Sequence, residues 1–292
     1  MSRQPSFEKL LDTPIRDEKG YFQYVKALYE EWRDRRNSGY PTLKRLNRRM
    51  DELSAEIPPQ FFTGNIHSPV VIISLNPHAD RNGGNTEITA ADYCQSWEDY
   101  RDFWTRFPEH RYAENGMARR EDGRLSNFDR KLHRFLSRNA AEVTSNELAR
   151  WNLFHLELFP IASPGFNNTR NMDDILFPFV LRSLEAVSLY ERDLILFLNR
   201  QLGDIIRRMA RNDCLEIKGE KVSKIEVKNR KSRCFRREFH VKLSNGACMK
   251  IIGAPTFAAQ GFDGSSLAEY GMKFFAENER KAIRKSLGIE DK

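Results

Sequence analysis

The chain has 292 residues, 40% of them hydrophobic and 30% charged, which suits one large domain or a domain with an insertion. No apolar run approaches the ~20 residues that span a bilayer, so the composition argues against a membrane-spanning helix. The opening stretch, MSRQPSFEKLLDTPIRDEKG, lacks the apolar core of a secretory signal, and we expect a cytoplasmic protein without membrane attachment.

The net charge of +7 is distributed unevenly along the chain. Between Arg207 and Lys250 there are 14 Lys or Arg against 5 Asp or Glu, a local excess of +9, so the rest of the chain sums to about −2. A basic patch on a nearly neutral body is typical of proteins that contact phosphate backbones. A solvated hairpin without a nucleic-acid partner has the same charge, and that alternative stays open.

Cysteine and histidine spacing argues against a metal centre. The four cysteines are too far apart for a Cys-x-x-Cys pair, and the six histidines show no metal-binding spacing. We therefore expect reduced thiols in this compartment, and neither a metal nor an organic cofactor.

In chain order, the first expected unit is a helical extension over residues 1–58. Aromatic and aliphatic residues recur at helical spacing in 21–56, and Pro58-Pro59 ends the pattern. Phe61–Asn65 follows as a turn-rich entry. Val70–Leu75 is then an unalternated apolar run, which is typical of a strand buried on both faces.

The middle of the chain alternates between predicted helices and strands. Two further strand candidates, residues 151–159 (WNLFHLELF) and 193–198 (DLILFL), contain mostly apolar side chains. The helical patterns around them cover Phe128–Leu136, Met172–Leu189 and Asn199–Arg211.

Residues 214–250 predict a basic β-hairpin inserted into the domain. Apolar residues alternate on both sides of a polar tip, Asn229–Arg233. A last short strand over Met249–Ile252 and a C-terminal helix from Ser265 to Leu287 complete the predicted elements.

This order predicts a three-layer α/β/α fold with a central, mostly parallel sheet. The helical extension would occupy 1–58, and residues 59–292 would form the main domain with the hairpin inside it. Sites in such sheets form beyond the carboxyl ends of the strands. We therefore expect three loops to converge there: residues 76–78, 160–170 and 253–261.

The loop after the first strand has no phosphate-binding or hydrolase motif. GxGxxG, GxxxxGK[ST] and GxSxG are all missing from the sequence. Pro77 restrains Asn76 toward extended geometry, which holds its carboxamide on a rigid turn. An amide can orient a water, and this suits a dissociative reaction such as glycosidic cleavage. Asn-Pro is also a common turn dipeptide, so a capping role stays open.

The segment VVIISLNPHAD resembles motif A of the uracil-DNA glycosylase superfamily. The mismatch-specific branch of that superfamily uses the Asn of this motif to place the attacking water, and Asn76 is the matching position. The uracil-specific branch has Asp there, followed by Pro-Tyr-His. His78 stands where that branch has Tyr and the mismatch branch has Gly.

Two later segments are similar to other parts of the same superfamily. WNLFHLELFPIASPGFNNTR resembles the second pocket strand, with Asn152 as the counterpart of an amide that reads the base edge. IIGAPTFAAQGF is placed like motif B, in which Pro255 matches, Thr256 stands for a serine and Ala254 replaces the usual His or Asn. The resemblance covers about residues 60–285 but depends on a few short motifs.

The resemblance implies a monofunctional DNA glycosylase that flips a base out of double-stranded DNA and leaves an abasic site. The implied catalytic residues are Asn76, His78 and Asp80. The implied substrate-binding residues are Asn152, Phe166, Pro255 and Thr256. The residues expected to contact phosphates are Arg230, Lys231, Arg233, Arg236 and Arg237. Packing for Phe166 and helix capping for Asp80 stay open.

The helical extension and the basic hairpin lie outside the compact family core. Together they resemble the bacterial phage-defence glycosylases of this superfamily, which excise a glucosylated hydroxymethylcytosine. This implies an antiviral function on phage DNA with modified bases, carried out by a monomer. Two other classes stay open: a non-catalytic nucleic-acid-binding module on the same fold, and a hydrolase of free nucleosides or bases.

Overall fold

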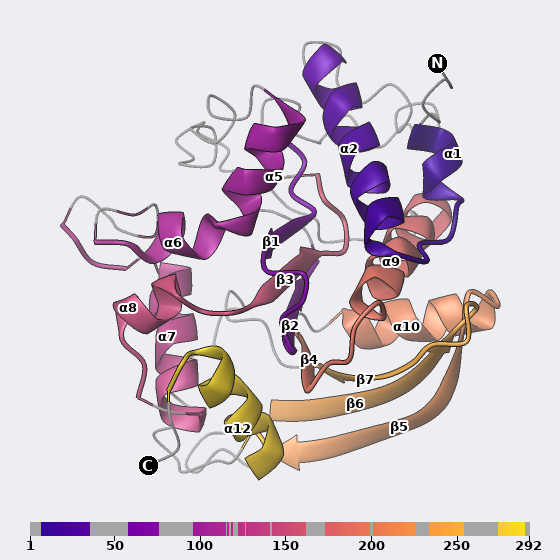
Figure 1. The fold of residues 1–292 in the computed structure, drawn as a ribbon. Helices are drawn as coiled ribbons and strands as arrows, with labels where there is room; N and C mark the ends of the chain where they lie inside the picture. The colour runs from indigo at the N-terminus through magenta and orange to yellow at the C-terminus, as the bar shows by residue number, and fades with distance from the viewer. Residues whose placement is uncertain are drawn as a thin grey trace.

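The computed structural model of the protein describes residues 7–35, 58–75, 96–114, 116, 118, 122–125, 127–140, 142–161, 173–198, 201–225, 234–253 and 274–289. It contains one seven-stranded sheet with helices around it (Figure 1). The strands are β1 (Phe62–Gly64), β2 (Val70–Ser74), β3 (Phe154–Glu157), β4 (Leu194–Phe197), β5 (Leu215–Ile225), β6 (Cys234–Leu243) and β7 (Cys248–Gly253).

The sheet has a parallel centre and antiparallel margins. Its strand order is β1-β3-β2-β4-β7-β6-β5. β2 pairs in parallel with β3 and β4, and β4 pairs in parallel with β7. β1 is antiparallel to β3 at one margin, while β6 and β5 extend the other margin as antiparallel strands. The predicted α/β class and the parallel centre of the sheet are confirmed.

Helices pack against the two faces of the parallel strands (Figure 1). Val71 and Ile73 of β2 point into one core, whereas Val70 and Ile72 point into the other. Successive side chains of a strand point to opposite faces, so the unalternated run VVIIS fills both cores. None of the helices in the described ranges has the length and apolarity that crossing a bilayer requires.

The helices of the first core are α1 (Phe7–Leu11), α2 (Glu18–Arg35), α5 (Trp97–Thr105), α9 (Asp173–Val187) and α10 (Leu202–Arg211). The helices that contribute to the second core are α7 (Asn127–Asn139), α8 (Ser145–Ala149) and α12 (Glu277–Ser286). The short helix α6 (Phe107–Tyr112) contributes to both, since Phe107 belongs to the first core and Tyr112 to the second.

The N-terminal helices α1 and α2 are part of the first core. Tyr21, Tyr24 and Leu28 are each at most 1% exposed. The backbone N–H of Ile15 donates to Glu185 Oε2 on α9 at 2.8 Å, which ties the segment between the two helices to the main body. The predicted helix over 21–56 is observed as far as Arg35, and residues 36–57 lie outside the described residues.

The sequence predicts a turn-rich segment over Phe61–Asn65, but the structure has a short strand there. Phe62–Gly64 forms β1 and pairs with β3, because Phe62 and its neighbours are buried against that strand. Gly64 has a φ of +83°, and a Cβ atom there would lie 2.1 Å from the carbonyl oxygen of Leu153. Only glycine allows this close approach at the end of the strand.

The predicted basic hairpin is formed by β5 and β6 and is continuous with the sheet. β6 pairs with β7 from Lys242↔Cys248 to Arg237↔Gly253, so β5 and β6 extend the parallel strands sideways. The predicted C-terminal helix over Ser265–Leu287 is observed only over Glu277–Ser286 as α12, because residues 274–276 are not helical, and residues 254–273 lie outside the described residues.

Candidate functional site

The four parallel strands end at one edge of the sheet, which we call the carboxyl edge. β2, β3, β4 and β7 end there at Ser74, Glu157, Phe197 and Gly253. The chain passes from β2 to β3 on one side, and then crosses to β4 on the other side of β2. Ligands of open α/β sheets bind outside such a switch point, so the ends of β2 and β4 define the candidate site.

The predicted catalytic loop begins at this switch point. Leu75, the residue after β2, accepts a hydrogen bond from the backbone N–H of Phe159 at 2.8 Å, which holds the start of the loop on the sheet. The predicted catalytic residues that follow, Asn76, His78 and Asp80, lie outside the described residues, as do Phe166, Pro255 and Thr256 of the predicted pocket and Arg230, Lys231 and Arg233 of the hairpin tip.

Three polar side chains meet at the carboxyl edge, and we call them the edge cluster. Ser74 ends β2, while His155 and Glu157 are alternate residues of β3 and therefore share a face. Ser74 Oγ lies 2.7 Å from His155 Nε2, and Glu157 Oε1 lies 3.5 Å from the same nitrogen. Ser74 and Glu157 are direct neighbours in the register of the two strands. Glu157 is only 5% exposed.

The histidine of the edge cluster is neutral at physiological pH. Burial, and to a smaller extent the positive charge of Arg111, lower the pKa of His155 to about 4. Arg111 is held by Asp129, with Nε to Oδ1 at 2.9 Å and Nη2 to Oδ2 at 3.0 Å. Asp129 is fully buried and also accepts from the Tyr112 hydroxyl at 3.0 Å.

The edge cluster differs from a nucleophile–base–acid triad. In a triad, the carboxylate holds the ring nitrogen opposite the one that faces the serine. Here Ser74 and Glu157 both approach Nε2 of His155. The cluster instead places a buried carboxylate, Glu157, beside the switch point. Within the described ranges, no group of three His, Cys, Asp or Glu is placed to hold a metal ion.

Asn152 lies at the other end of β3 from the candidate site. The strand begins two residues later, at Phe154, so Asn152 belongs to the amino edge of the sheet. Its Oδ1 accepts from Asn65 Nδ2 at 3.0 Å, and its backbone N–H donates to the carbonyl oxygen of Ser286 at 2.9 Å. The prediction that Asn152 reads a base at the carboxyl edge is therefore wrong, and its contacts join the loop before β2 to the end of α12.

Arg236, predicted to contact phosphate, is buried in an ion pair. It is 8% exposed, and its Nη1 and Nη2 lie 2.7 and 2.8 Å from the two carboxylate oxygens of Glu279. Its Nε donates to Glu238 at 3.1 Å. These bonds occupy the guanidinium, so this prediction is wrong. The neighbouring Arg237 has a side chain that is 38% exposed and lies 3.7 Å from Glu220.

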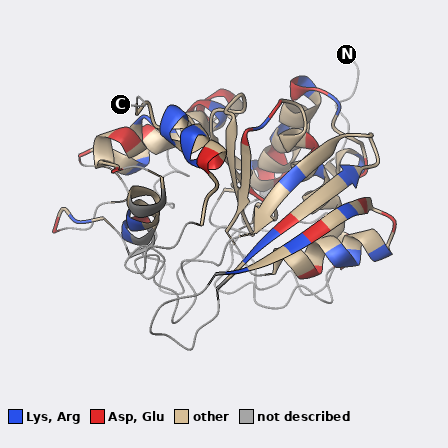
Figure 2. Cartoon of the chain, turned by 90° about the horizontal axis from the view of Figure 1, so that it is seen from below, with Lys and Arg blue, Asp and Glu red and all other residues tan. Residues whose placement is uncertain are grey.

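The two hairpin strands are less basic than the whole 207–250 segment. Together β5 and β6 contain six Lys or Arg and three Glu, and basic and acidic residues are interspersed along them (Figure 2). Because Arg237 is paired with Gly253 at the end of β7, β6 continues beyond the carboxyl edge as far as Cys234. In sequence, the residues that connect the two strands, 226–233, have more Lys or Arg than acidic residues, and they lie outside the described residues.

The sequence interpretation missed the edge cluster, although a signal was present. His155 and Glu157 stand two residues apart in the segment FHLE, and both interrupt an otherwise apolar strand. Polar residues at alternate positions of a buried strand share one face, and burial of both is costly unless they bind a partner or a ligand.

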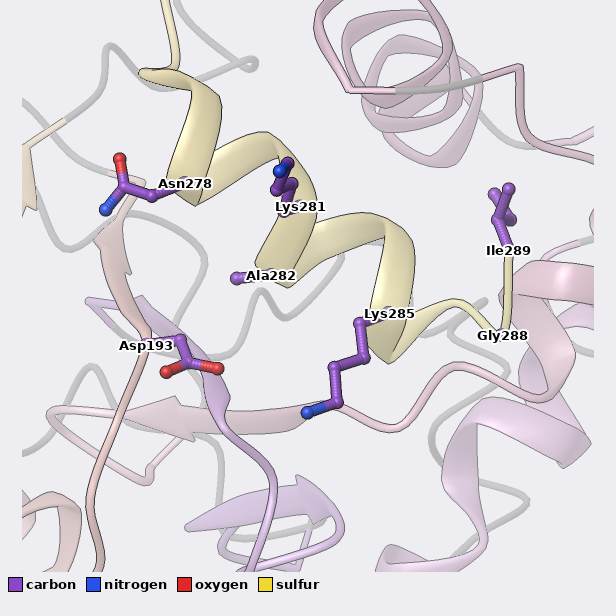
Figure 3. A pocket seen from close by; sticks show the side chains of 7 residues that line it. All are labelled: Asp193, Asn278, Lys281, Ala282, Lys285, Gly288 and Ile289. Carbon is purple, nitrogen blue, oxygen red and sulfur yellow. The ribbon is translucent and has the colours of Figure 1, made fainter. Parts of the chain in front are cut away.

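A hollow of about 620 Å³ lies away from this site (Figure 3). It is lined by Asp193, Asn278, Lys281, Ala282, Lys285, Gly288 and Ile289. Asp193 directly precedes β4, so the hollow belongs to the amino edge of the sheet. No predicted site residue is among its lining residues, and it is not the candidate site.

No protein-family model matches the sequence, and no curated protein or solved structure matches it either. The described sheet and its strand ends define the class: an α/β protein with a candidate ligand site at the carboxyl edge. The similarity to the uracil-DNA glycosylase superfamily depends on the sequence motifs alone.

Proposed function

We propose that the protein is a monofunctional DNA glycosylase with a three-layer, uracil-DNA glycosylase-like fold. It would flip a modified base out of double-stranded DNA and hydrolyse the N-glycosidic bond, leaving an abasic site. One observation supports the proposal: β2 ends at the carboxyl edge two residues before Asn76 in the chain, and β6 continues past Gly253 at the same edge. Base excision from a duplex needs a catalytic loop and a phosphate-binding arm on the same side of the protein.

In this proposal, Asn76 orients a water toward C1′ of the sugar, and His78 or Asp80 assists departure of the base. A dissociative transition state depends more on positioning and electrostatics than on a strong nucleophile. The hairpin residues Arg230, Lys231, Arg233 and Arg237 contact phosphates. The most specific form of the proposal is excision of glucosylated hydroxymethylcytosine from phage DNA by a cytoplasmic monomer, as an antiviral defence.

Asn76→Ala is expected to slow base release by about 100-fold or more, since loss of one group that positions or stabilises reacting atoms costs about 10²–10³ in rate. The full chain is incubated with duplexes that contain uracil, mismatched thymine, hydroxymethylcytosine or its glucosylated form, and alkali-labile sites are counted. Asn146→Ala, on the exposed surface of α8, is the matched control and should retain the wild-type rate. Release from none of the duplexes by the wild-type protein, or equal rates for both proteins, refutes the proposal.

Replacing both Arg230 and Arg233 with Gln is expected to weaken binding to any duplex, whichever base it contains. Each lost phosphate contact lowers the slope of log K against log salt by about 0.9, so the slope should fall by about 2. Gel shifts over a salt series measure this, with Arg101→Gln on the exposed face of α5 as the matched control. If the protein hydrolyses free nucleosides instead, the double variant should turn them over at the wild-type rate. An unchanged slope of log K against log salt would show that Arg230 and Arg233 do not contact DNA.

A further inference from the structure

We propose that Phe235, on the outer part of the hairpin, stacks on DNA bases. The protein should then bind DNA with an interrupted base stack more tightly than an intact duplex. This inference rests on the DNA-binding part of the proposed function, and it adds a contact with the bases to the proposed phosphate contacts. It does not depend on base release.

Two large apolar side chains are exposed on the hairpin, and we call them the apolar pair. Val222 of β5 is 48% exposed and Phe235 of β6 is 40% exposed. No other large hydrophobic side chain in the described ranges is as exposed. Water solvates neighbouring apolar side chains poorly, so such a pair marks an interaction surface more often than a single exposed side chain does.

The apolar pair lies on one face of the hairpin. Val222 pairs with Arg237 in the register of the two strands, and Phe235 is two residues from Arg237 along β6. Alternate residues of a strand share a face, so Val222 and Phe235 are diagonal neighbours on that face. An aromatic side chain reaches its diagonal neighbour, and the two side chains therefore form one apolar surface.

This face of β6 leaves the protein core before it reaches the apolar pair. Phe239 points to the same face, is fully buried in the first core, and has the guanidinium carbon of Arg207 on α10 5.7 Å from its ring centre. Phe235 is four residues earlier in β6, where its side chain is exposed. Since Arg237 pairs with Gly253 at the end of β7, Phe235 lies two residues, about 7 Å, beyond the carboxyl edge. The apolar pair thus belongs to the edge that contains the candidate site.

The charges around the apolar pair favour a polyanion as its partner. Arg237, on the same face, has a side chain that is 38% exposed and lies 3.7 Å from Glu220. Lys221 of β5 is exposed as well. By sequence, residues 226–233 contain four Lys or Arg and one Glu. A second copy of this chain would bring these like charges together, whereas DNA supplies phosphates for the cations and apolar base faces for Phe235.

The chemistry of stacking determines which DNA is preferred. Aromatic side chains on exposed sheet faces bind bases by stacking, and this contact tolerates any base. In an intact duplex each base is covered by its neighbours on both faces, so Phe235 can stack only where a base is unpaired or displaced. A flipped nucleotide leaves such a place beside it. Stacking releases no counter-ions, so its contribution to binding does not depend on salt.

Fluorescence anisotropy over a salt series tests the inference with the full chain and two DNAs, an intact duplex and the same duplex with one bulged, unpaired base. The wild-type protein is expected to bind the bulged duplex at least about fivefold more tightly, the smallest effect that stacking of one base gives. Phe235→Ala should bind both DNAs equally. Its slope of log K against log salt should match that of the wild-type protein, because no phosphate contact is lost.

Two further variants of Phe235 separate stacking from general apolar contact. Leucine is apolar but has no ring, so Phe235→Leu should also lose most of the preference, whereas Phe235→Trp should retain it. His240→Ala, at an exposed position on the opposite face of β6, is the matched control and should keep the wild-type preference. Because Phe235 is exposed, its replacement should leave the melting temperature unchanged, and thermal melting checks this.

The outcomes separate this inference from the function on which it rests. Equal binding of both DNAs by the wild-type protein, or an unchanged preference in Phe235→Ala or Phe235→Leu, overturns the inference and leaves the glycosylase proposal standing. A dimer that is lost in Phe235→Ala assigns the apolar pair to a second copy and also overturns the inference. A preference that requires Phe235, without release of any base, supports the inference and overturns the glycosylase proposal. Binding to neither DNA overturns both.

Discussion

Replacing Glu279 with alanine is expected to lower the free energy of unfolding by about 3 kcal/mol, because the buried guanidinium of Arg236 then loses the acceptor of two hydrogen bonds and keeps only the carboxylate of Glu238 as a counter-ion. Glu279 is 1% exposed and accepts two hydrogen bonds from Arg236, at 2.7 and 2.8 Å. It also accepts from the backbone N–H of Ala276 at 2.9 Å and lies 3.3 Å from Lys250 Nζ. Urea unfolding followed by circular dichroism measures the change.

A neighbouring glutamate on the same helix provides the control. The Glu277 side chain is 55% exposed and pairs with Arg280 and Arg284, so Glu277→Ala should cost at most about 1 kcal/mol. The double variant Arg236→Met with Glu279→Leu should recover much of the lost stability, since it removes both charges together. A loss below about 1 kcal/mol for Glu279→Ala would show that Arg236 finds other partners and that the pair does not fasten α12 to β6.

The free energy of unfolding is expected to fall as the pH drops from about 6.5 to 4. His155 is expected to account for up to about 3 kcal/mol of this decrease. The pKa of His155 is lowered to about 4 in the folded protein, against 6.5 for an unperturbed histidine. Between these values the unfolded chain binds a proton that the folded protein does not. This contribution is complete above pH 6.5 and is lost as the pH falls toward 4. The groups that face the ring are Arg111, Glu157 and Ser74.

Urea unfolding of the wild-type protein and of His155→Gln at several pH values between 4.5 and 7 tests this. The glutamine keeps a polar partner for Ser74 but does not titrate, so the stability of the variant should depend less on pH. His240→Gln, on an exposed position of β6, should follow the wild-type curve. Parallel curves for wild type and His155→Gln would contradict a ring that stays neutral in the folded protein.

Strands in the centre of the sheet could be predicted from the sequence because their side chains are buried on both faces. The apolar runs at 70–75 and 193–198 predict β2 and β4 to within one residue at each end. β1 is different, because three residues have no recognisable period and their pairing partner, β3, is distant in the chain. The sideways pairing of β6 with β7 also depends on long-range contacts that no local pattern contains.

The candidate site could be predicted only in part. The rule that loops after parallel strands share an edge locates the loop that begins with Asn76, and it depends on strand order alone. Asn152 was assigned to the base pocket by the resemblance of its segment to a family motif, whereas in the fold it precedes β3, which begins at Phe154, at the amino edge of the sheet. Arg236 was expected on the surface because the hairpin is basic, but its partner Glu279 is on a helix 43 residues away. Such partners appear only in the folded chain.

The last strand of the sheet has a consequence for how the protein behaves at high concentration. β5 is one of the two margins of the sheet, and no described strand pairs with its outer side along its 11 residues. A strand edge of this length favours pairing with the same strand of another copy, which leads to aggregation. Lys218, Lys221 and Lys224 place like charges along it, and the register shift between Ile217 and Gly219 distorts its hydrogen-bonding pattern. These lysines and the register shift therefore protect the sheet from adding a strand of its own kind.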